Sequence, residues 1–516
     1  MSTKTYILLY LFYNFLSISF AQVTPPEIEW QNALGGSEYD SVYAIRNTLD
    51  GGYVVAGRIQ SSDGDITGFH GGIDIWVVKL NSEGDLQWQK ALGGSNSDIG
   101  RSIQPTSDGG VIVAGSTNST DGDITNNIGG GDIWLVKLDN TGNIEWEKTY
   151  GGTNDEWPNF IKQTTDGGFI IAGGTVSDDG DISGHHGMAD AWVFKINQNG
   201  DFLWQTALGG SEWDTARAIK QTSDGGYIVG ASSESNDGDV SVNQGIDDFW
   251  FIKLSSNGTI EWEKTYGGSE SEIIRGIEIT PDGGYIASGY TDSNDGDISF
   301  NYGDRDYWIV KITSTGNLEW EKTFGGSDYD LGDNIHSTID GYAMVGYTYS
   351  SDGDVLNNQG IADIWMIKIN EFGDIQWQKS LGGSDTDFTD SESLQLTADG
   401  GYVIAGYTVS NDGDVSGNNG SMDYWVVKLS PDNLNILEND NVGLSVFPNP
   451  ARNFIVIDSS AMIYELNIYS VSGELLMSKN IAKSNSRIDI STLSSGIYIL
   501  EILNENIAEK VKLIKQ

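Results

Sequence analysis

Hydrophobic and polar positions alternate over short stretches of the chain, and no stretch has the period of a helix. Residues 41–48 and 53–59 are β-branched and aromatic runs separated by Asp50-Gly51-Gly52, a signal for a tight hairpin. Two further runs, 75–80 and 86–92, are separated by a polar turn. The pattern predicts four antiparallel strands in this segment and excludes a helical solenoid.

The four-strand segment recurs seven times. The pattern Trp-x-x-x-(Leu/Tyr/Phe)-Gly-Gly-(Ser/Thr) begins at Trp30, Trp88, Trp146, Trp204, Trp262, Trp320 and Trp377. The step is 58 residues except for the last, which is 57 because the turn at Asp340-Gly341-Tyr342 lacks one glycine. Seven four-stranded repeats predict an all-β fold, a seven-bladed β-propeller.

The two ends of the repeat array complement each other. The array begins with a fourth strand, residues 28–34, and ends with a third strand, residues 423–429. An open solenoid could have the same period, but it would not need complementary partial blades. We therefore expect the N-terminal strand to complete the last blade, which removes the exposed sheet edges.

Two residues of each third strand recur in every repeat. Alternation places Trp76, Val78 and Leu80 on one face of their strand, so we expect the recurring Trp to pack between blades rather than to form a ligand platform. This Trp occupies positions 76, 134, 192, 250, 308, 365 and 425. A Lys three residues later points to the other face, and we expect it to pair with a carboxylate: Lys79, Lys137, Lys195, Lys253, Lys311, Lys368 and Lys428.

Composition narrows the function classes. The 516 residues contain 74 Asp and Glu against 28 Lys and Arg, a formal charge of -46, and no Cys. Nucleic acid and anionic membranes are excluded as partners because both bind clustered cations. The absence of Cys excludes disulfides, thiolate catalysis and sulfur-ligated metals. Neither a Gly-x-Ser-x-Gly elbow nor a zincin motif occurs.

Carboxylates recur in the loops of one propeller face. The loop before each first strand has an acid three residues after the Gly-Gly-(Ser/Thr): Asp40, Asp98, Glu156, Asp214, Glu272, Asp330 and Asp387. An Asp-Gly-Asp loop recurs at Asp63, Asp65, Asp121, Asp123, Asp179, Asp181, Asp237, Asp239, Asp295, Asp297, Asp352, Asp354, Asp412 and Asp414. Backbone amides could satisfy these carboxylates in Asx-turns. Ca²⁺ could do the same, so calcium is our speculative metal hypothesis; an EF-hand is rejected.

Departures from the repeat are candidate ligand contacts. Tyr39, Trp213 and Tyr329 occupy one position of the loop before the first strand, and Trp157 lies two residues further along its own repeat. Exposed aromatic rings could stack on sugars. The alternative is that they cover neighbouring loops. The four His residues, at 70, 185, 186 and 336, follow no repeat.

The N-terminus has the features of an export signal. Lys4 precedes a mostly apolar stretch from Tyr6 to Phe20, and Ser19 and Ala21 supply small residues before a cleavage site. We expect residues 1–21 to be removed and the mature chain to have no transmembrane span.

The C-terminal segment has a different composition and a set of short motifs. Residues 443–516 contain four alternating runs, which predict a small β-sandwich. Its motifs include Pro448, Asn449, Pro450, Gly473, Gly496, Lys512 and Lys515. This segment resembles the C-terminal sorting domain of the type IX secretion system, the Por secretion tail. The resemblance implies export by type IX secretion machinery to the outer cell surface or the medium of a Gram-negative cell.

These observations define the expected organisation. We predict a signal peptide at 1–21, a propeller at 22–430, a linker at 431–442 and a sorting domain at 443–516. We expect a monomeric, secreted or surface-bound binding propeller, with a glycan or a protein as ligand and no catalytic residue. The alternative is an extracellular polysaccharide-acting enzyme that uses carboxylates of the acidic face.

Overall fold

The computed structural model describes residues 24–432, 444–448, 451–470, 475–494, 496–504 and 508–515, and their regular elements are all strands. Pro25–Asn433 form one compact unit, and the chain from Leu434 onward belongs to a second. The expected signal peptide at 1–21 and most of the linker at 431–442 lie outside the described residues. Those boundaries remain predictions. No helix among the described residues is long and apolar enough to span a membrane.

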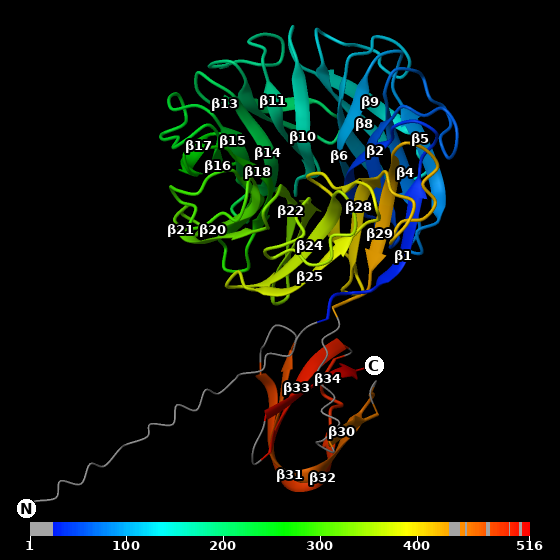
Figure 1. Ribbon diagram of the computed structural model, residues 1–516, viewed down its shortest axis with the longest axis vertical. Coiled ribbons are helices and arrows are strands. Elements are labelled where there is room, and N and C mark those ends of the chain that lie inside the picture. Colours follow the sequence, from blue (N-terminus) through cyan, green and yellow to red (C-terminus); the bar gives the residue numbers. More distant parts are fainter. Residues whose placement is uncertain are drawn as a thin grey trace, which may run out of the picture. The chain divides into compact units, whose positions relative to one another are not determined.

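Pro25–Asn433 contain seven antiparallel sheets, the blades of a propeller (Figure 1). Blade 1 consists of β2 (Ser41–Asn47), β3 (Tyr53–Ile59), β4 (Asp74–Leu80) and β5 (Leu86–Leu92). Blade 2 consists of β6 (Asp98–Pro105), β7 (Val111–Thr117), β8 (Asp132–Leu138) and β9 (Ile144–Tyr150). Blade 3 consists of β10 (Glu156–Gln163), β11 (Phe169–Thr175), β12 (Asp190–Ile196) and β13 (Phe202–Leu208).

The remaining blades follow the same order. Blade 4 consists of β14 (Asp214–Gln221), β15 (Tyr227–Ser233), β16 (Asp248–Leu254) and β17 (Ile260–Tyr266). Blade 5 consists of β18 (Glu272–Ile279), β19 (Tyr285–Thr291), β20 (Asp306–Ile312) and β21 (Leu318–Phe324). Blade 6 consists of β22 (Asp330–Thr338), β23 (Gly341–Thr348), β24 (Asp363–Asn370) and β25 (Ile375–Leu381). Blade 7 consists of β26 (Asp387–Phe388), β27 (Leu394–Leu396), β28 (Tyr402–Thr408), β29 (Asp423–Leu429) and β1 (Ile28–Leu34).

The ring closes as the partial repeats predict. β1 pairs antiparallel with β29, with Ile28 opposite Leu429 and Trp30 opposite Lys428. We call the first strand of each blade its inner strand. Inner strands contact one another around the whole ring, in the order β2, β6, β10, β14, β18, β22, β27 and back to β2. They enclose the space on the propeller axis, which we call the channel.

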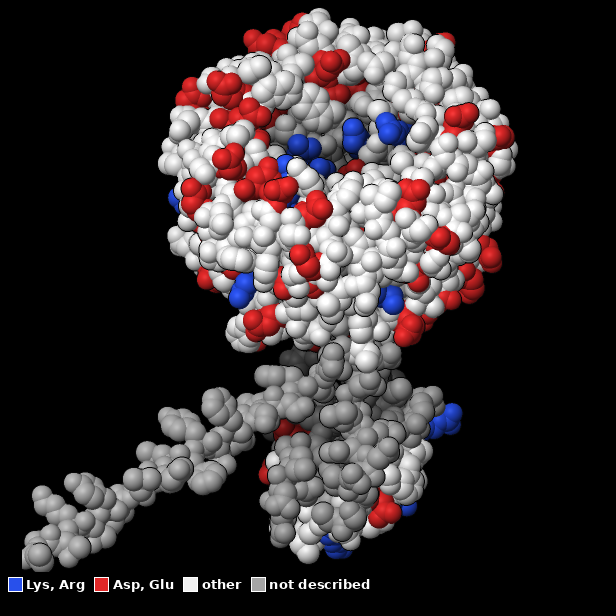
Figure 2. Space-filling model, viewed as in Figure 1, with Lys and Arg blue, Asp and Glu red and all other residues white. Residues whose placement is uncertain are grey.

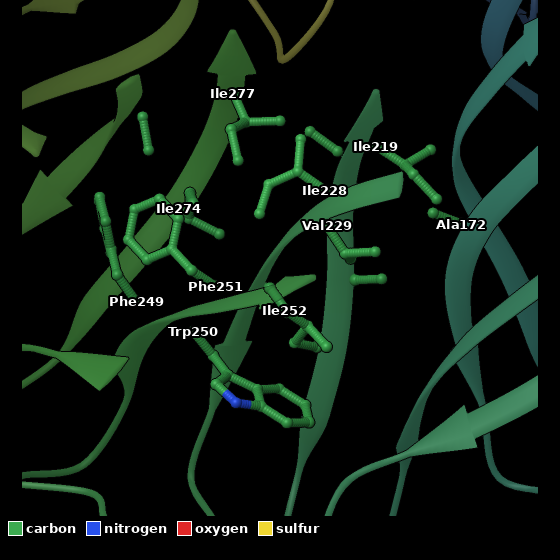
Figure 3. Close-up of a cluster of buried hydrophobic side chains, with 14 of the residues drawn as sticks. Ala172, Ile219, Ile228, Val229, Phe249, Trp250, Phe251, Ile252, Ile274 and Ile277 are labelled. Atoms are coloured by element: carbon green, nitrogen blue, oxygen red, sulfur yellow. The ribbon is translucent and has the colours of Figure 1, made fainter. Parts of the chain in front are cut away.

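The recurring Trp of the third strand packs between blades, as predicted. All seven have no exposed surface. The Trp76 ring lies 4.9 Å from the ring of Tyr424 in the preceding blade. Figure 3 shows Trp250 of β16 within a cluster to which blades 3, 4 and 5 contribute, with Ala172 from β11 and Ile274 from β18. Burial of a side chain of this size contributes about 3 kcal/mol or more.

The second Trp series packs against the following blade. A Cβ atom added at Gly84 would lie 2.7 Å from the Trp30 ring, and Gly84 has a φ of +86°. The turn therefore needs glycine both for its backbone conformation and for the ring that covers it. The same contact recurs at Gly142, Gly200, Gly258, Gly316 and Gly373.

Every recurring Lys pairs with a carboxylate, as predicted. Its partner in each blade is the Asp of the Asp-Gly turn between the first and second strands. In blade 4, the Lys253 Nζ lies 3.0 Å from Asp224 and 3.1 Å from Glu261. The seven turn residues are Asp50, Asp108, Asp166, Asp224, Asp282, Asp340 and Asp399.

The second unit is a five-stranded antiparallel sheet. Its strands are β30 (Leu444–Phe447), β31 (Phe454–Ser470), β32 (Leu475–Asp489), β33 (Gly496–Asn504) and β34 (Ala508–Lys515). β31 and β32 are long and bend at register shifts such as that between Asp458 and Ile463. The sequence predicts a small β-sandwich here, and the described residues form a five-stranded β-domain with an apolar core.

Candidate functional site

One face of the propeller bears two loops from every blade, which we call the loop face. It holds the loops before the inner strands and the loops between the second and third strands. The first Asp of each Asp-Gly-Asp loop accepts a backbone hydrogen bond from the neighbouring loop. In blade 1, the Ser37 N–H donates to Asp63 Oδ1 at 2.8 Å, and all seven blades repeat this bond. Loop closure is therefore the first role of these carboxylates.

Two further acids per blade are buried beneath this face. The acid that begins each inner strand accepts from a glycine N–H, as in the 2.9 Å bond from Gly36 to Asp40. The Asp that begins each third strand accepts from the N–H four residues earlier, as in the 2.7 Å bond from His70 to Asp74. Among the described residues, the Oδ1 of each third-strand Asp is buried and has no hydrogen-bond partner: Asp74, Asp132, Asp190, Asp248, Asp306, Asp363 and Asp423.

The third-strand Asp residues hold protons more tightly than free carboxyls. The pKa of Asp248 is raised to about 7, mainly by burial and to a smaller extent by neighbouring acids such as Glu272 and Asp297. Burial also raises the pKa of Asp74, Asp132 and Asp423 to about 6. Protonation of these carboxyls as the pH falls reduces the repulsion between neighbouring acids.

The rim carboxylates serve loop structure in every blade. Among the described residues, no group of three or more His, Asp or Glu side chains could hold a metal ion. Calcium binding at Asp63 and its equivalents therefore remains a prediction. The alternative in which carboxylates of this face act on a polysaccharide likewise remains a prediction.

The four candidate aromatic residues border the inner strands on the loop face. Tyr39, Trp213 and Tyr329 are 51%, 40% and 44% exposed. The Trp157 and Trp213 rings stack with centroids 6.3 Å apart and planes at 28°. Arg305 lies over the Tyr329 ring at 5.7 Å, and Asp292 holds its guanidinium at 2.6 and 2.7 Å.

The channel contains a second group of candidate residues, which sequence analysis missed. In blades 1 to 6, the pairing of the inner strand with the second strand skips one residue, a β-bulge. Bulges re-aim side chains and occur next to functional sites. The skipped residues are Tyr43, Arg101, Asn159, Arg217, Arg275 and Asp333.

Five of the six bulge residues line a small cavity in the channel, the upper cavity. Tyr43, Arg101, Asn159, Arg217 and Arg275 surround it together with Asp390 and Ser391 of blade 7. Its water-accessible volume is about 30 Å³. Figure 2 shows Lys and Arg side chains gathered inside the central opening, whereas Asp and Glu are scattered over the surrounding face.

A lower cavity of about 40 Å³ follows along the axis, further from the loop face. Arg46, Lys162, Lys220 and His336 line it. Phe160 lies beneath two of these cations, 5.7 Å from Arg46 and 6.0 Å from Lys220. Burial, with Arg46 and Lys220 close by, lowers the pKa of Lys162 to about 7.

Blade 7 departs from the other blades at the channel. Residues 389–393 interrupt its inner strand between β26 and β27. The buried Glu392 of this segment forms an ion pair with Arg46 and accepts a hydrogen bond from Ser102 of blade 2. The segment thus fills part of the channel and leaves the two cavities.

A signal for the channel was present in the sequence. Arg101, Arg217 and Arg275 all lie three residues after the acid that begins their inner strand. Aligning the repeats would have shown that three of them have Arg at this position. The bulge that directs it inward depends on strand pairing.

Comparison with known proteins identifies the C-terminal unit. Residues 445–516 match the family model described as a secretion system C-terminal sorting domain. The fold and this domain define an exported β-propeller protein, secreted or carried to the cell surface by the type IX secretion system. The expected sorting residues lie within the match; Asn449, Pro450 and Gly473 fall outside the described residues.

The propeller has more distant similarities. The chain is 23% identical over 402 residues to the regulatory protein FlaEY of Caulobacter vibrioides, a match that covers 67% of this chain and 41% of FlaEY. PorZ, a surface component of the type IX secretion system of Porphyromonas gingivalis, is 12% identical with a TM-score of 0.22, covering 96% of this chain and 86% of PorZ. The Pan2 WD40 domain of Neurospora crassa is 10% identical with a TM-score of 0.41, covering 77% and 95%.

Proposed function

We propose that the exported propeller is a binding protein whose loop face binds an extracellular glycan. The observation that carries this proposal is the set of exposed and half-buried aromatic rings that border the inner strands on the loop face. Trp157 and Trp213 stack on each other, and Tyr39 and Tyr329 are about half exposed. The repeat does not require an aromatic residue at these positions, because other blades have Ser97, Asp155, Ser271 and Thr386 in the place of Trp213. Aromatic faces stack favourably on sugar rings.

A glycan array with the purified chain tests the proposal. We expect the double substitution Trp213→Ala with Tyr329→Ala to lower binding at least about tenfold, since each lost stacking contact weakens binding by about 1 kcal/mol. Phe372→Ala is the matched control, because Phe372 is 66% exposed in a turn on the opposite face. Unchanged binding by the double variant contradicts the proposal. Release of reducing ends from a bound glycan would instead support the enzyme alternative.

Export through the sorting domain has its own test. Deleting residues 443–516 should retain the protein in the cell envelope, because residues 445–516 carry the sorting domain. Fractionation of cells and medium measures the outcome. Normal secretion of the truncated chain would show that the propeller is exported by another route.

A further inference from the structure

The basic residues of the propeller separate into repeated and unique sets. The repeated set comprises the Lys of each third strand and a Lys in five of the fourth strands. The unique set comprises Arg46, Arg58, Arg101, Lys162, Arg217, Lys220, Arg275 and Arg305. Six of these eight line the two channel cavities. In a chain with a formal charge of -46, the basic residues that the repeat does not explain thus converge on the axis.

Carboxylates offset only some of these charges. Glu392 pairs with Arg46, Glu278 lies 2.9 Å from Lys220, and Asp390 lies 3.9 Å from Arg275. Asp333 accepts a hydrogen bond from Thr389 and also faces Arg275. Within the described residues, Arg101, Arg217 and Lys162 have no ion pair with a carboxylate.

Arg217 has a further unmet requirement. Its Nε is buried and has no hydrogen-bond partner within the described part of the chain, and the same holds for the Nε of Arg275. A buried donor without a partner destabilises a protein. The two Nε donors therefore favour the binding of a hydrogen-bond acceptor in this cavity.

The upper cavity sets the size of that group. A water molecule needs about 10–15 Å³ of such volume, so the 30 Å³ cavity accepts a group of a few heavy atoms. A sugar ring does not fit. The Tyr43 ring orients Arg101 and lies 4.7 Å from its guanidinium. Arg217 belongs to blade 4, two blades after Arg101, and lines the same cavity. Guanidinium groups bind planar or tetrahedral oxyanions through paired N–H donors.

We propose that the upper cavity is an anion-binding site, in which Arg101 and Arg217 hold a carboxylate, sulfate or phosphate group. The remainder of the ligand extends out of the channel toward the loop face. Arg275, offset by Asp333 and Asp390, closes the other side of the site. This site is separate from the aromatic surface, and its test requires no glycan.

Isothermal titration calorimetry of the full chain with glucuronate, sulfate and phosphate, at a constant ionic strength set with sodium chloride, measures the interaction. We expect saturable binding of at least one oxyanion. Arg217→Gln should weaken it at least about tenfold, a loss of about 1.4 kcal/mol, and Arg217→Lys should retain part of it. Lys264→Gln is the matched control, since Lys264 is an exposed fourth-strand lysine remote from the channel. It should leave the affinity unchanged.

The outcomes separate the alternatives. Binding of glucuronate but not sulfate or phosphate assigns a carboxylate ligand, and the converse assigns a tetrahedral one. If none of the three probes binds, the proposal is overturned. It is also overturned if Arg217→Gln and Arg101→Gln bind the anion with the same affinity as the parent protein. Without a ligand, Arg217→Gln should melt at or above the temperature of the parent protein, because it removes an unpaired charge. A lower melting temperature would instead assign Arg217 a structural role.

Discussion

The lysines of the third strands and the cations of the channel are both largely withdrawn from water, yet their surroundings differ. Lys368 is 1% exposed at its side chain and pairs with Asp340 at 2.6 Å, and the corresponding pair forms in every blade. Arg217 occurs at one bulge, and its buried Nε has no partner among the described residues. A basic residue that recurs with its carboxylate thus serves the blade, whereas Arg217, whose Nε lacks such a partner among the described residues, is the residue that we propose for an anionic ligand.

The tryptophans show the same division. Trp250 has no exposed surface and recurs in every blade, whereas Trp213 is 40% exposed and has no Trp at the equivalent position elsewhere. Position within the repeat, rather than residue type, therefore separates structural from functional candidates.

Substituting the two kinds of Trp should give the largest difference. We expect Trp250→Ala to lower the free energy of unfolding by about 3–5 kcal/mol, because it leaves a cavity between blades. Trp213→Ala should change it by less than about 0.5 kcal/mol. Urea denaturation measures both. A loss below about 1 kcal/mol for Trp250→Ala would mean that the blades do not depend on this packing.

Two charge-removing substitutions should have smaller effects than Trp250→Ala, and their effects should differ from each other. Asp340→Asn leaves the buried Lys368 without its carboxylate, and we expect a loss of about 2 kcal/mol in unfolding free energy. Arg217→Gln should not destabilise the protein. Equal destabilisation by both substitutions, measured by thermal melting, would contradict the distinction between paired and unpaired cations.

Acidification should stabilise the propeller at first. The pKa of Asp248, Asp306 and Asp363 is raised to about 7 by burial in the folded chain, so the folded state binds protons that the unfolded state releases. Each unit of such a shift corresponds to about 1.4 kcal/mol, and stability therefore rises as the pH falls from 8 toward 5.

Further acidification should reverse this trend. Hydrogen bonds from Lys311 and Thr280 lower the pKa of Asp282 to about 2, so its contribution is lost below the ordinary carboxyl pKa of about 4. Melting temperatures between pH 8 and pH 3 should pass through a maximum. Asp248→Asn should flatten the upper part of the curve, and a melting temperature that falls steadily from pH 8 would refute the assignment of these protons.

Calcium should have the smallest effect. The Oδ1 of Asp63 and its equivalents already accepts a backbone hydrogen bond, so Ca²⁺ would have to bind through the remaining oxygens. We expect millimolar Ca²⁺ to raise the melting temperature by no more than about 2 °C, as for a weak site near its dissociation constant. A large shift that a chelator reverses would show that the rim carboxylates form cation sites.

Most of the fold could be predicted from the sequence, because a pattern that recurs seven times assigns the strands of all blades together. The expected runs 28–34, 53–59, 86–92 and 423–429 coincide with β1, β3, β5 and β29. The closure of the ring, the burial of Trp76 and its equivalents and the pairing of each third-strand Lys followed from the same comparison. The C-terminal unit was less predictable: the alternating runs at 454–458 and 464–470 belong to one strand, β31, and no expected run corresponds to β30 or β32.

The channel was not predicted, because its Arg residues recur at their repeat position in only three blades and the bulges that turn them inward depend on strand pairing. The bulge at Arg217 arises when two residues of one strand oppose one residue of its partner, which hydrophobic alternation does not reveal. The interruption at 389–393 places Glu392 against residues more than 280 positions away in the chain, including Arg46 and Ser102. Such contacts depend on ring closure and cannot be inferred from local patterns.

The pairing of β1 with β29 also determines how the protein responds to tension. The Ser430 N–H donates to the Glu27 carbonyl at 2.8 Å, so both ends of the propeller leave from the same corner of blade 7. A force that pulls these ends apart therefore unzips one pair of strands, breaking its bonds in succession from Ile28 and Leu429. The other six blades bear no load until that seam has opened.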